Sequence, residues 1–496
     1  MTATTTVTSV ASALATAVPS ARLLIGGAWL PASQGATFAV TNPVDGGLVS
    51  EVPDATDDDL RAAISAAADA FGPWSRRPAI ERARILRRAA DLLRERAEDV
   101  ATVLTAEQGK PLAEARGEVE YAAGFFEWFS GEAERAYGQV VAASRPGYRV
   151  LVLRQPVGVT AAITPWNFPA AMLTRKLGPA LAAGCTTVCK PASATPLTAI
   201  AICQVLVDAG VPAGVVNLVT TRRARAAADV LMADPRVRKV SFTGSTEVGQ
   251  YLIGASAAGV KRLSLELGGH APYLVFDDAD LDVAVSGLMA AKFRNAGQTC
   301  ISVNRVYVHR SVVDEFVSRL GEAVKLLAIG NGLAPGTQIG PLIDAAAVAK
   351  VAEHVDDAVA NGASLEVGGR PLADLGPTFY APTIVTGVTP GMLVSREETF
   401  GPLVAVSTFD SEDEAIELAN NSPFGLAAYF CTRDYARLLR VAERLEYGII
   451  GANDGAPSSP SAPFGGMKLS GYGREGGAFG IDDYLDVKYL SIGGVI

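Results

Sequence analysis

Short runs of β-branched and apolar residues alternate with segments of helical periodicity through the middle of the chain, and this alternation limits the possible folds more than any other feature. The first series predicts strands at residues 157–163, 186–189, 215–219 and 237–242 and helices at 196–209 and 224–232. The second series predicts strands at 273–276 and 305–309 and helices at 280–293 and 312–327. Strands joined by helices of this length pair in parallel through right-handed crossovers. The sequence therefore predicts an α/β protein with two layers and a boundary near residue 268.

The composition agrees with a large packed core and excludes several classes of protein. Hydrophobic residues make up 49% of the 496 residues and charged residues 19%, which excludes overall disorder. The net charge of −9 lacks the basic excess of a general nucleic-acid binder, so we expect no nucleic-acid partner. The sequence has no run of about 20 apolar residues. We therefore expect no membrane span.

The cysteines and the N-terminal segment bear on localisation. Five cysteines are an odd and sparse set for this length, which favours a reducing cytoplasm over a disulfide framework. Residues 1–20 contain no lysine or arginine, so they lack the cationic start of a targeting peptide. Their Thr, Ala and Ser bias predicts a flexible N-terminal tail.

Two features suggest ligand sites that their context does not support. Residues 471–476, Gly-Tyr-Gly-Arg-Glu-Gly, match the G-x-G-x-x-G dinucleotide pattern, but no predicted strand precedes them and only 20 residues follow. The crossover unit that this pattern requires does not fit there, so we expect a structural turn. The three histidines, His270, His309 and His354, have no metal-ligand spacing, and we expect no metal site.

Cys300 and Glu266 stand out as candidate catalytic residues. Cys300 follows a polar, glycine-containing turn, where converging backbone amides can stabilise a thiolate and later an oxyanion. Glu266 ends an apolar strand beside two glycines, and burial there raises the pKa of a carboxyl group toward the range of a general base. The alternatives are a small buried hydrophobe for Cys300, as we expect for the other four cysteines, and an ion-paired core acid for Glu266.

Five short fragments in order carry a family resemblance. They are T-P-W-N-F-P at 164–169, L-E-L-G-G at 265–269, G-Q-T-C at 297–300, E-E-T-F-G-P at 397–402 and P-F-G-G at 463–466. Together they resemble the aldehyde dehydrogenase superfamily from about residue 22 onward. The resemblance implies a Rossmann-type parallel-sheet cofactor domain (21–135 and 155–267), an α/β catalytic domain (268–460) and a small β oligomerisation arm (136–154 and 475–496). It also implies a homodimer or homotetramer.

The resemblance assigns a catalytic role to three residues. Cys300 matches the nucleophile that forms a thiohemiacetal and then a thioester. Asn167, with the backbone N–H of Cys300, matches the oxyanion hole. Glu266 matches the general base that activates water for hydrolysis. The implied reaction is the oxidation of an aldehyde to a carboxylic acid with NAD(P)+.

The resemblance also implies the cofactor site. The matching residues are Thr164, Trp166, Lys190, Ser193, Gly244, Ser245, Leu267, Glu398 and Phe400. Gly244 and Ser245 lie at a helix N-terminus, which favours the pyrophosphate. Ser193 replaces the acid that repels a 2′-phosphate in NAD-preferring members, so we expect NADP+ to be preferred and NAD+ to be usable. Arg222 or Arg223 either adds to this phosphate site or forms a solvated basic turn.

The residues that match the family's substrate pocket are Arg175, Arg294, Ser458, Phe168 and Phe464. The two arginines and the serine resemble the succinate-semialdehyde dehydrogenase branch, where they bind the far carboxylate of the substrate. Succinate semialdehyde is therefore the expected substrate, and glutarate semialdehyde or a medium-chain or aromatic aldehyde is the alternative.

Two further roles are open to this fold, a CoA-acylating enzyme and a non-enzymatic structural protein. Glu266 argues against the first, since that subgroup usually lacks the hydrolytic glutamate. The intact set of Cys300, Glu266 and Asn167 argues against the second. Ser302 stands where related enzymes often carry a second cysteine, which excludes a local regulatory disulfide.

Overall fold

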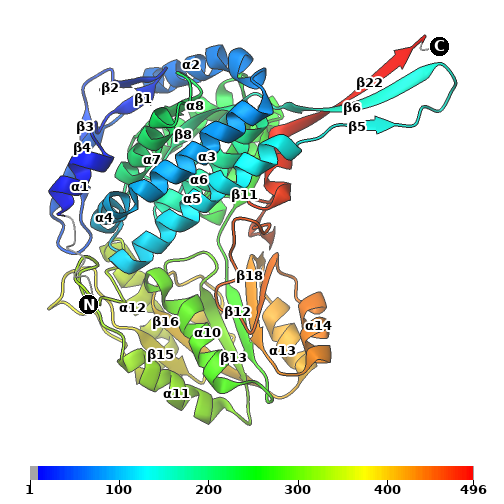
Figure 1. Cartoon of the computed structure of the whole chain (residues 1–496). Helices are drawn as coiled ribbons and strands as arrows, with labels where there is room; N and C mark the ends of the chain where they lie inside the picture. Colours follow the sequence, from blue (N-terminus) through cyan, green and yellow to red (C-terminus); the bar gives the residue numbers. More distant parts are fainter. Residues whose placement is uncertain (1–8, 495–496) are drawn as a thin grey trace, which may run out of the picture.

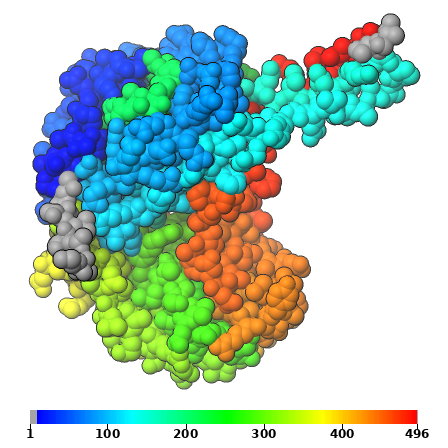
Figure 2. All heavy atoms as spheres, in the orientation of Figure 1, coloured from blue at the N-terminus to red at the C-terminus, as the bar shows by residue number. Residues whose placement is uncertain are grey.

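The computed structural model describes residues 9–494 and contains two stacked α/β bodies and a narrow projecting arm (Figure 1). The space-filling view shows the arm extending well away from both bodies (Figure 2). Five β-sheets make up the strand content of this part of the chain, and two of them, of eight and seven strands, form the bodies. The expected α/β fold class is confirmed.

The first body is built on an eight-stranded sheet. Its order is β2 (Ala28–Leu30), β1 (Leu23–Ile25), β9 (Val216–Leu218), β8 (Thr186–Lys190), β7 (Val159–Ile163), β10 (Val237–Thr243), β11 (Arg262–Glu266) and β21 (Gly471–Tyr472). The five strands from β9 to β11 are parallel, and the edge strands are antiparallel. In this sheet, β8 and β9 lie on one side of β7, and β10 and β11 lie on its other side. The strand order therefore reverses between β7 and β10. Ligands bind beyond the carboxyl ends of strands at such a reversal.

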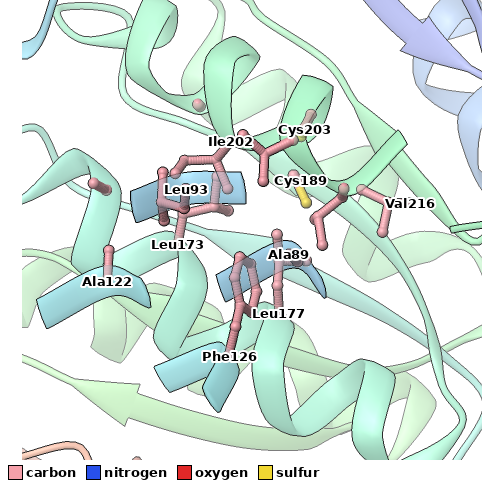
Figure 3. Close-up of a cluster of buried hydrophobic side chains, with 14 of the residues drawn as sticks. Ala89, Leu93, Ala122, Phe126, Leu173, Leu177, Cys189, Ile202, Cys203 and Val216 are labelled. Atoms are coloured by element: carbon pink, nitrogen blue, oxygen red, sulfur yellow. The ribbon is translucent and has the colours of Figure 1, made fainter. Parts of the chain in front are cut away.

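Helices cover both faces of this sheet. The first face packs against α3 (Ala79–Glu95), α4 (Ala97–Gln108), α5 (Leu112–Arg135), α6 (Pro169–Ala183) and α7 (Pro196–Asp208). Figure 3 shows Leu93, Phe126, Leu173 and Leu177 meeting in this core, with Cys189 and Cys203 nearby. The second face packs against α2 (Asp57–Ser75), α8 (Ala224–Ala233) and α9 (Thr246–Ser256).

The second body is built on a seven-stranded sheet. Its order is β14 (Ser364–Val367), β15 (Thr383–Thr386), β16 (Leu403–Phe409), β13 (Val303–His309), β12 (Ala271–Val275), β18 (Ala427–Cys431) and β19 (Ile449–Ala452), parallel except for β14. Its helices are α10 (Leu281–Phe293), α11 (Val313–Lys325), α12 (Ala345–Ala360), α13 (Glu412–Asn420) and α14 (Tyr435–Arg444). Asp280 caps α10 by accepting from the backbone N–H groups of Asp282 and Val283.

The arm is a three-stranded antiparallel sheet of β5 (Gln139–Val141), β6 (Tyr148–Pro156) and β22 (Leu485–Gly493). It exposes apolar side chains, among them Val140, Val487 and Tyr489. Two small two-stranded sheets complete the strands, β3 (Thr37–Thr41) with β4 (Leu48–Pro53), and β17 (Phe424–Gly425) with β20 (Met467–Lys468). Among the residues described, none of the helices combines the length and apolar character needed to cross a bilayer.

The structure corrects the prediction of a flexible tail over residues 1–20. The segment Val10–Ala17 forms helix α1, which packs against α4 and buries Ala13 and Ala17 completely or nearly so. Ser9 caps it by accepting from the Ser12 N–H at 3.2 Å. The small residues that suggested a loose tail allow the close approach of two helices instead. Residues 1–8 of the tail and 495–496 of the arm lie outside the described residues.

The G-x-G-x-x-G segment forms no phosphate loop and contributes the short edge strand β21 and a turn. Gly471 and Gly473 have φ values of +111° and +90°, a region that side-chain-bearing residues rarely adopt. A Cβ at Gly471 would lie 2.0 Å from the carbonyl oxygen of Leu265. These glycines are therefore required for backbone packing against β11.

Candidate active site

The candidate site lies at the carboxyl ends of the parallel strands of the first sheet, where the strand order reverses. The strand register aligns Phe242 with Ile163 and Ile163 with Lys190, and it places Thr243 opposite Glu266. The residues that follow these strands therefore converge at one edge of the sheet, facing the second body.

Two adjoining cavities occupy this edge. The larger, of about 600 Å³, is lined by the predicted cofactor residues Thr164, Trp166, Lys190, Ser193, Gly244 and Ser245. The smaller, of about 250 Å³, is lined by Trp166, Asn167, Gly244, Ser245, Leu267, Cys300, Glu398 and Phe400. The structure thus brings all nine predicted cofactor residues, together with Cys300 and Asn167, around one continuous space.

Two basic residues that line these cavities were not found from the sequence. Arg225 lines the larger cavity, with its guanidinium carbon 4.2 Å from the centre of the Tyr251 ring. Lys350, from α12, lines the smaller cavity beside Glu398. No local sequence signal marks Lys350, because it lies 50 residues after Cys300 and only the fold brings it near.

The expectation that Arg222 or Arg223 joins the cofactor site is not supported by their positions. Neither side chain lines the cavity. The Arg223 guanidinium donates to the carbonyl oxygen of Ala55 at 2.8 Å and lies 3.4 Å from the Asp57 carboxylate. The alternative of an exposed basic turn fits these two residues, and Arg225 lines the cavity in their place.

Cys300 follows a turn of unusual backbone conformation. Asn295, Ala296 and Gly297 have φ values of +52°, +53° and +78°, so three consecutive residues lie in the left-handed region. Such strain persists only where the surroundings fix the backbone. Asn295 provides this restraint, because its side-chain amide donates to the carbonyl oxygen of Asn167 at 3.0 Å and accepts from Gln108 at 3.0 Å.

Gly268 and Gly269 set the approach of Glu266 to Cys300. A Cβ on Gly269 would lie 2.4 Å from the carbonyl oxygen of Cys300, and one on Gly268 would lie 3.2 Å from a Glu398 oxygen. The backbone N–H of Gly269 donates to Glu398 Oε1 at 3.2 Å. The two glycines therefore let the chain pass directly beside the cysteine turn.

Burial dominates the electrostatics of the two candidate catalytic groups. It raises the pKa of the Cys300 thiol to about 12, although the Arg175 guanidinium acts in the opposite direction. It also raises the pKa of Glu266 well above its usual value, with a further contribution from Glu475. Within residues 9–494, neither carboxyl oxygen of Glu266 has a hydrogen-bond partner. Glu266 is therefore a buried, unpaired acid, as a general base requires, and the alternative of an ion-paired core acid does not hold.

Asn167 is held by a buried polar network. Its Nδ2 donates to the carbonyl oxygen of Gln298 at 3.0 Å, which leaves its second N–H available. Its own carbonyl oxygen accepts from Lys110 Nζ at 2.7 Å, and Lys110 pairs with Glu118 at 2.5 Å. Because both charged partners are buried, this pair fixes the backbone at Asn167 rather than contributing a surface ion pair.

Among the predicted substrate residues, each arginine contacts a phenylalanine, and none of the five lines either of the two cavities. Arg175 is fully buried and lies 4.1 Å from the centre of the Phe464 ring, and Arg294 lies 5.2 Å from the centre of the Phe168 ring. In the described part of the chain, Arg175 Nη1 and Ser458 Oγ are buried without a hydrogen-bond partner. Tyr121 was not found from the sequence, and its buried hydroxyl is unpartnered in the same way.

Comparison with known proteins agrees with this geometry. The model of the aldehyde dehydrogenase family matches residues 29–490. The chain belongs to this family. Among its relatives, the NADP+-dependent succinate-semialdehyde dehydrogenase of Escherichia coli is 54% identical over 95% of this chain and 97% of its own length. The glutarate-semialdehyde dehydrogenase of Pseudomonas aeruginosa is 53% identical over the same shares.

Solved structures of this family share the fold closely. The crystal structure of a succinate-semialdehyde dehydrogenase from Burkholderia pseudomallei has a TM-score of 0.94 and 51% sequence identity. The match covers 95% of this chain and 98% of that one. The aldehyde dehydrogenase fold expected from the sequence is therefore confirmed, and the chain is an enzyme that oxidises aldehydes.

Replacing Gly269 with alanine tests the close approach of Glu266 to the cysteine turn. We expect G269A to lower kcat by roughly 100-fold or more, because the new methyl group displaces the Cys300 carbonyl and a misplaced nucleophile reacts slowly. Initial rates of NADPH formation measure the effect. The matched control is G254A in α9, where a Cβ meets nothing within 4 Å. Equal rates for G269A and the control would contradict the proposed geometry.

Proposed function

We propose that the protein oxidises succinate semialdehyde to succinate with NADP+. The observation that carries the proposal is that Arg175 Nη1 and Ser458 Oγ are each buried without a hydrogen-bond partner within residues 9–494. A buried polar group without a partner costs free energy, so its presence in a pocket favours a ligand that supplies the missing acceptor. A carboxylate on the far end of a short aldehyde supplies two acceptor oxygens.

The charge of the pocket supports an anionic substrate. Arg175 and Arg294 provide two guanidinium groups, which bind carboxylates with fixed geometry and offset the cost of burying an anion. The relatives described above are named for succinate and glutarate semialdehydes, and both of these compounds carry a terminal carboxylate. Glutarate semialdehyde is the second candidate, because it is longer by one methylene group and such a change alters binding only modestly.

The residues of this chain account for the chemical steps. Cys300 Sγ attacks the aldehyde carbon, and the Cys300 N–H with the free N–H of Asn167 Nδ2 stabilises the resulting oxyanion. When bound, NADP+ would supply the acceptor for the hydride that leaves the aldehyde carbon. The thioester left on Cys300 is hydrolysed by water that Glu266 deprotonates. The raised pKa of Glu266 suits it to this proton transfer near neutral pH.

The two adjoining cavities fit the cofactor. Lys190 lines the larger cavity and, within the described residues, forms no ion pair, while burial lowers its pKa to about 8. Lys190, Ser193 and Arg225 would hold the 2′-phosphate of NADP+, and the N-terminus of α9 at Ser245 would hold the pyrophosphate. Glu398 and Lys350 would hold the nicotinamide ribose.

The remaining assignments follow from the same family membership. We propose that the first body is the cofactor domain, the second the catalytic domain, and the three-stranded arm an oligomerisation surface in a homodimer or homotetramer. The exposed apolar side chains of the arm support this assignment. A reducing cytoplasmic location fits the five free cysteines.

Removing Arg294 tests carboxylate recognition. We expect R294A to lower kcat/KM for succinate semialdehyde roughly 100-fold, because truncating one partner of a buried charge pair costs a few kcal/mol. The value for butanal, which has the same chain length and no carboxylate, should change about threefold or less. Steady-state kinetics with both aldehydes provide the comparison. Parallel losses for the two substrates would refute the carboxylate assignment.

Removing Arg225 tests the 2′-phosphate site. We expect R225A to raise KM for NADP+ roughly 10- to 100-fold, the range for loss of a charge-assisted hydrogen bond, and to leave KM for NAD+ nearly unchanged. The control R222A removes an exposed arginine three positions earlier that does not line the cavity. An equal effect of R225A on both cofactors would show that Arg225 does not contact the 2′-phosphate.

The raised pKa of Glu266 predicts the pH dependence of thioester hydrolysis. Only the carboxylate form accepts a proton, so the rate of hydrolysis should rise as pH increases through this raised pKa and fall below it. In E266Q, we expect a first turnover of NADPH at near-normal amplitude and a steady state slower by roughly 100-fold or more. Stopped-flow absorbance across a pH series separates the two phases. A loss of the first turnover would contradict the assigned role.

A further inference from the structure

The G-x-G-x-x-G segment carries a buried carboxylate, Glu475, to the substrate end of the active site. The backbones of Glu475 and Phe464 form two hydrogen bonds. The distance is 2.7 Å from Phe464 N to Glu475 O and 2.8 Å from Glu475 N to Phe464 O. The same turn therefore positions both the carboxylate of Glu475 and the ring of Phe464. Glu475 itself is 4% exposed.

The Glu475 carboxylate has two separate sets of partners. Its Oε2 accepts from Arg175 Nε at 2.6 Å. Its Oε1 accepts from Lys176 Nζ at 2.5 Å and from Ser241 Oγ at 3.0 Å. One oxygen thus serves the arginine and the other serves the lysine and the serine, so the two functions can be separated by mutation.

Three contacts restrain the Arg175 guanidinium, and the Tyr121 hydroxyl lies beside it. Its Nε is held by Glu475, its Nη2 donates to Met172 Sδ at 2.9 Å, and its plane lies against the ring of Phe464. Within the described residues, Nη1 is buried without a partner. These contacts fix the guanidinium and leave Nη1 available to donate to a ligand carboxylate.

The charges explain why an acid is needed at this position. Arg175 and Lys176 are neighbours on α6, and the side chains of both are completely buried. Two adjacent buried cations are unfavourable unless an anion compensates them. One carboxylate shared by two cations leaves a net positive charge, so the network stays attractive to an anionic substrate while Arg175 stays fixed.

We propose that Glu475 is a positioning residue that orients Arg175 and thereby determines the preference of the enzyme for aldehydes that carry a carboxylate. This inference rests on the proposed function and adds a residue that does not itself contact the substrate. Kinetics can distinguish the proposed role of Glu475 from that of Glu266. Hydrolysis of the thioester follows hydride transfer, so it affects kcat and does not affect kcat/KM for the aldehyde.

The test compares kcat/KM for succinate semialdehyde and butanal in four proteins: wild type, E475Q, E475D and S241A. E475Q removes the charge, and E475D keeps it but withdraws it by one methylene group from Arg175. S241A is the matched control, because it removes a partner of Oε1 and leaves the Oε2 contact with Arg175 intact. Competitive inhibition by succinate and by butyrate, with butanal as the substrate, gives a second readout of carboxylate binding that needs no oxidation of the inhibitor.

We expect kcat/KM for succinate semialdehyde, divided by kcat/KM for butanal, to fall about tenfold or more in both E475Q and E475D. The reason is that a small displacement of Arg175 weakens its contact with the substrate carboxylate. Inhibition by succinate should weaken in parallel, and S241A should keep the wild-type ratio. An E475D variant with the wild-type ratio would overturn the proposal, since it would show that charge alone suffices. E475D decides the matter if E475Q does not fold.

The wild-type ratio tests the proposed function separately. A wild-type enzyme without preference for succinate semialdehyde over butanal would refute that function and remove the basis for this inference. A wild-type preference that survives in both Glu475 variants would refute only the role of Glu475.

Discussion

The chain crosses from the first sheet to the second through Gly268 and Gly269, and this crossing fixes the reaction centre. Any side chain at Gly269 would overlap the carbonyl oxygen of Cys300. Glu266, two residues before Gly268, ends β11, and Ala271, two residues after Gly269, begins β12. The proposed general base and the turn that carries the proposed nucleophile are therefore held by the same few backbone atoms, and each body contributes one of them.

The second requirement of the site is to keep several charged groups out of water. Burial raises the pKa of Glu266, which has no hydrogen-bond partner within residues 9–494, whereas Arg175 and Lys176 lower the pKa of Glu475 despite its burial. Two buried glutamates thus serve different purposes because their neighbours differ. One is left free for proton transfer, and the other is committed to holding a cation.

The sequence predicted the strands well, because β-branched runs such as 186–189 and 237–242 favour only one local structure. It also proposed Cys300, Glu266 and Asn167 as catalytic residues, because they lie in distinctive short fragments. It could not place Arg225 rather than Arg222, since side-chain direction at the start of α8 depends on the packing of that helix. Lys350 and the Arg175–Glu475 pair were inaccessible because long-range folding alone brings them to the site. Helix α1 was missed because its small residues carry no helical periodicity of their own.

The central claim is that an acyl group passes through the sulfur of Cys300 and is released by Glu266. Mass spectrometry of peptides from E266Q, acid-quenched during turnover with succinate semialdehyde and NADP+, tests it most directly. The account predicts a succinyl adduct on the peptide that contains Cys300, present only when both aldehyde and NADP+ are added. NADPH formed by E266Q without an adduct on Cys300, or with the adduct on another cysteine, would contradict it.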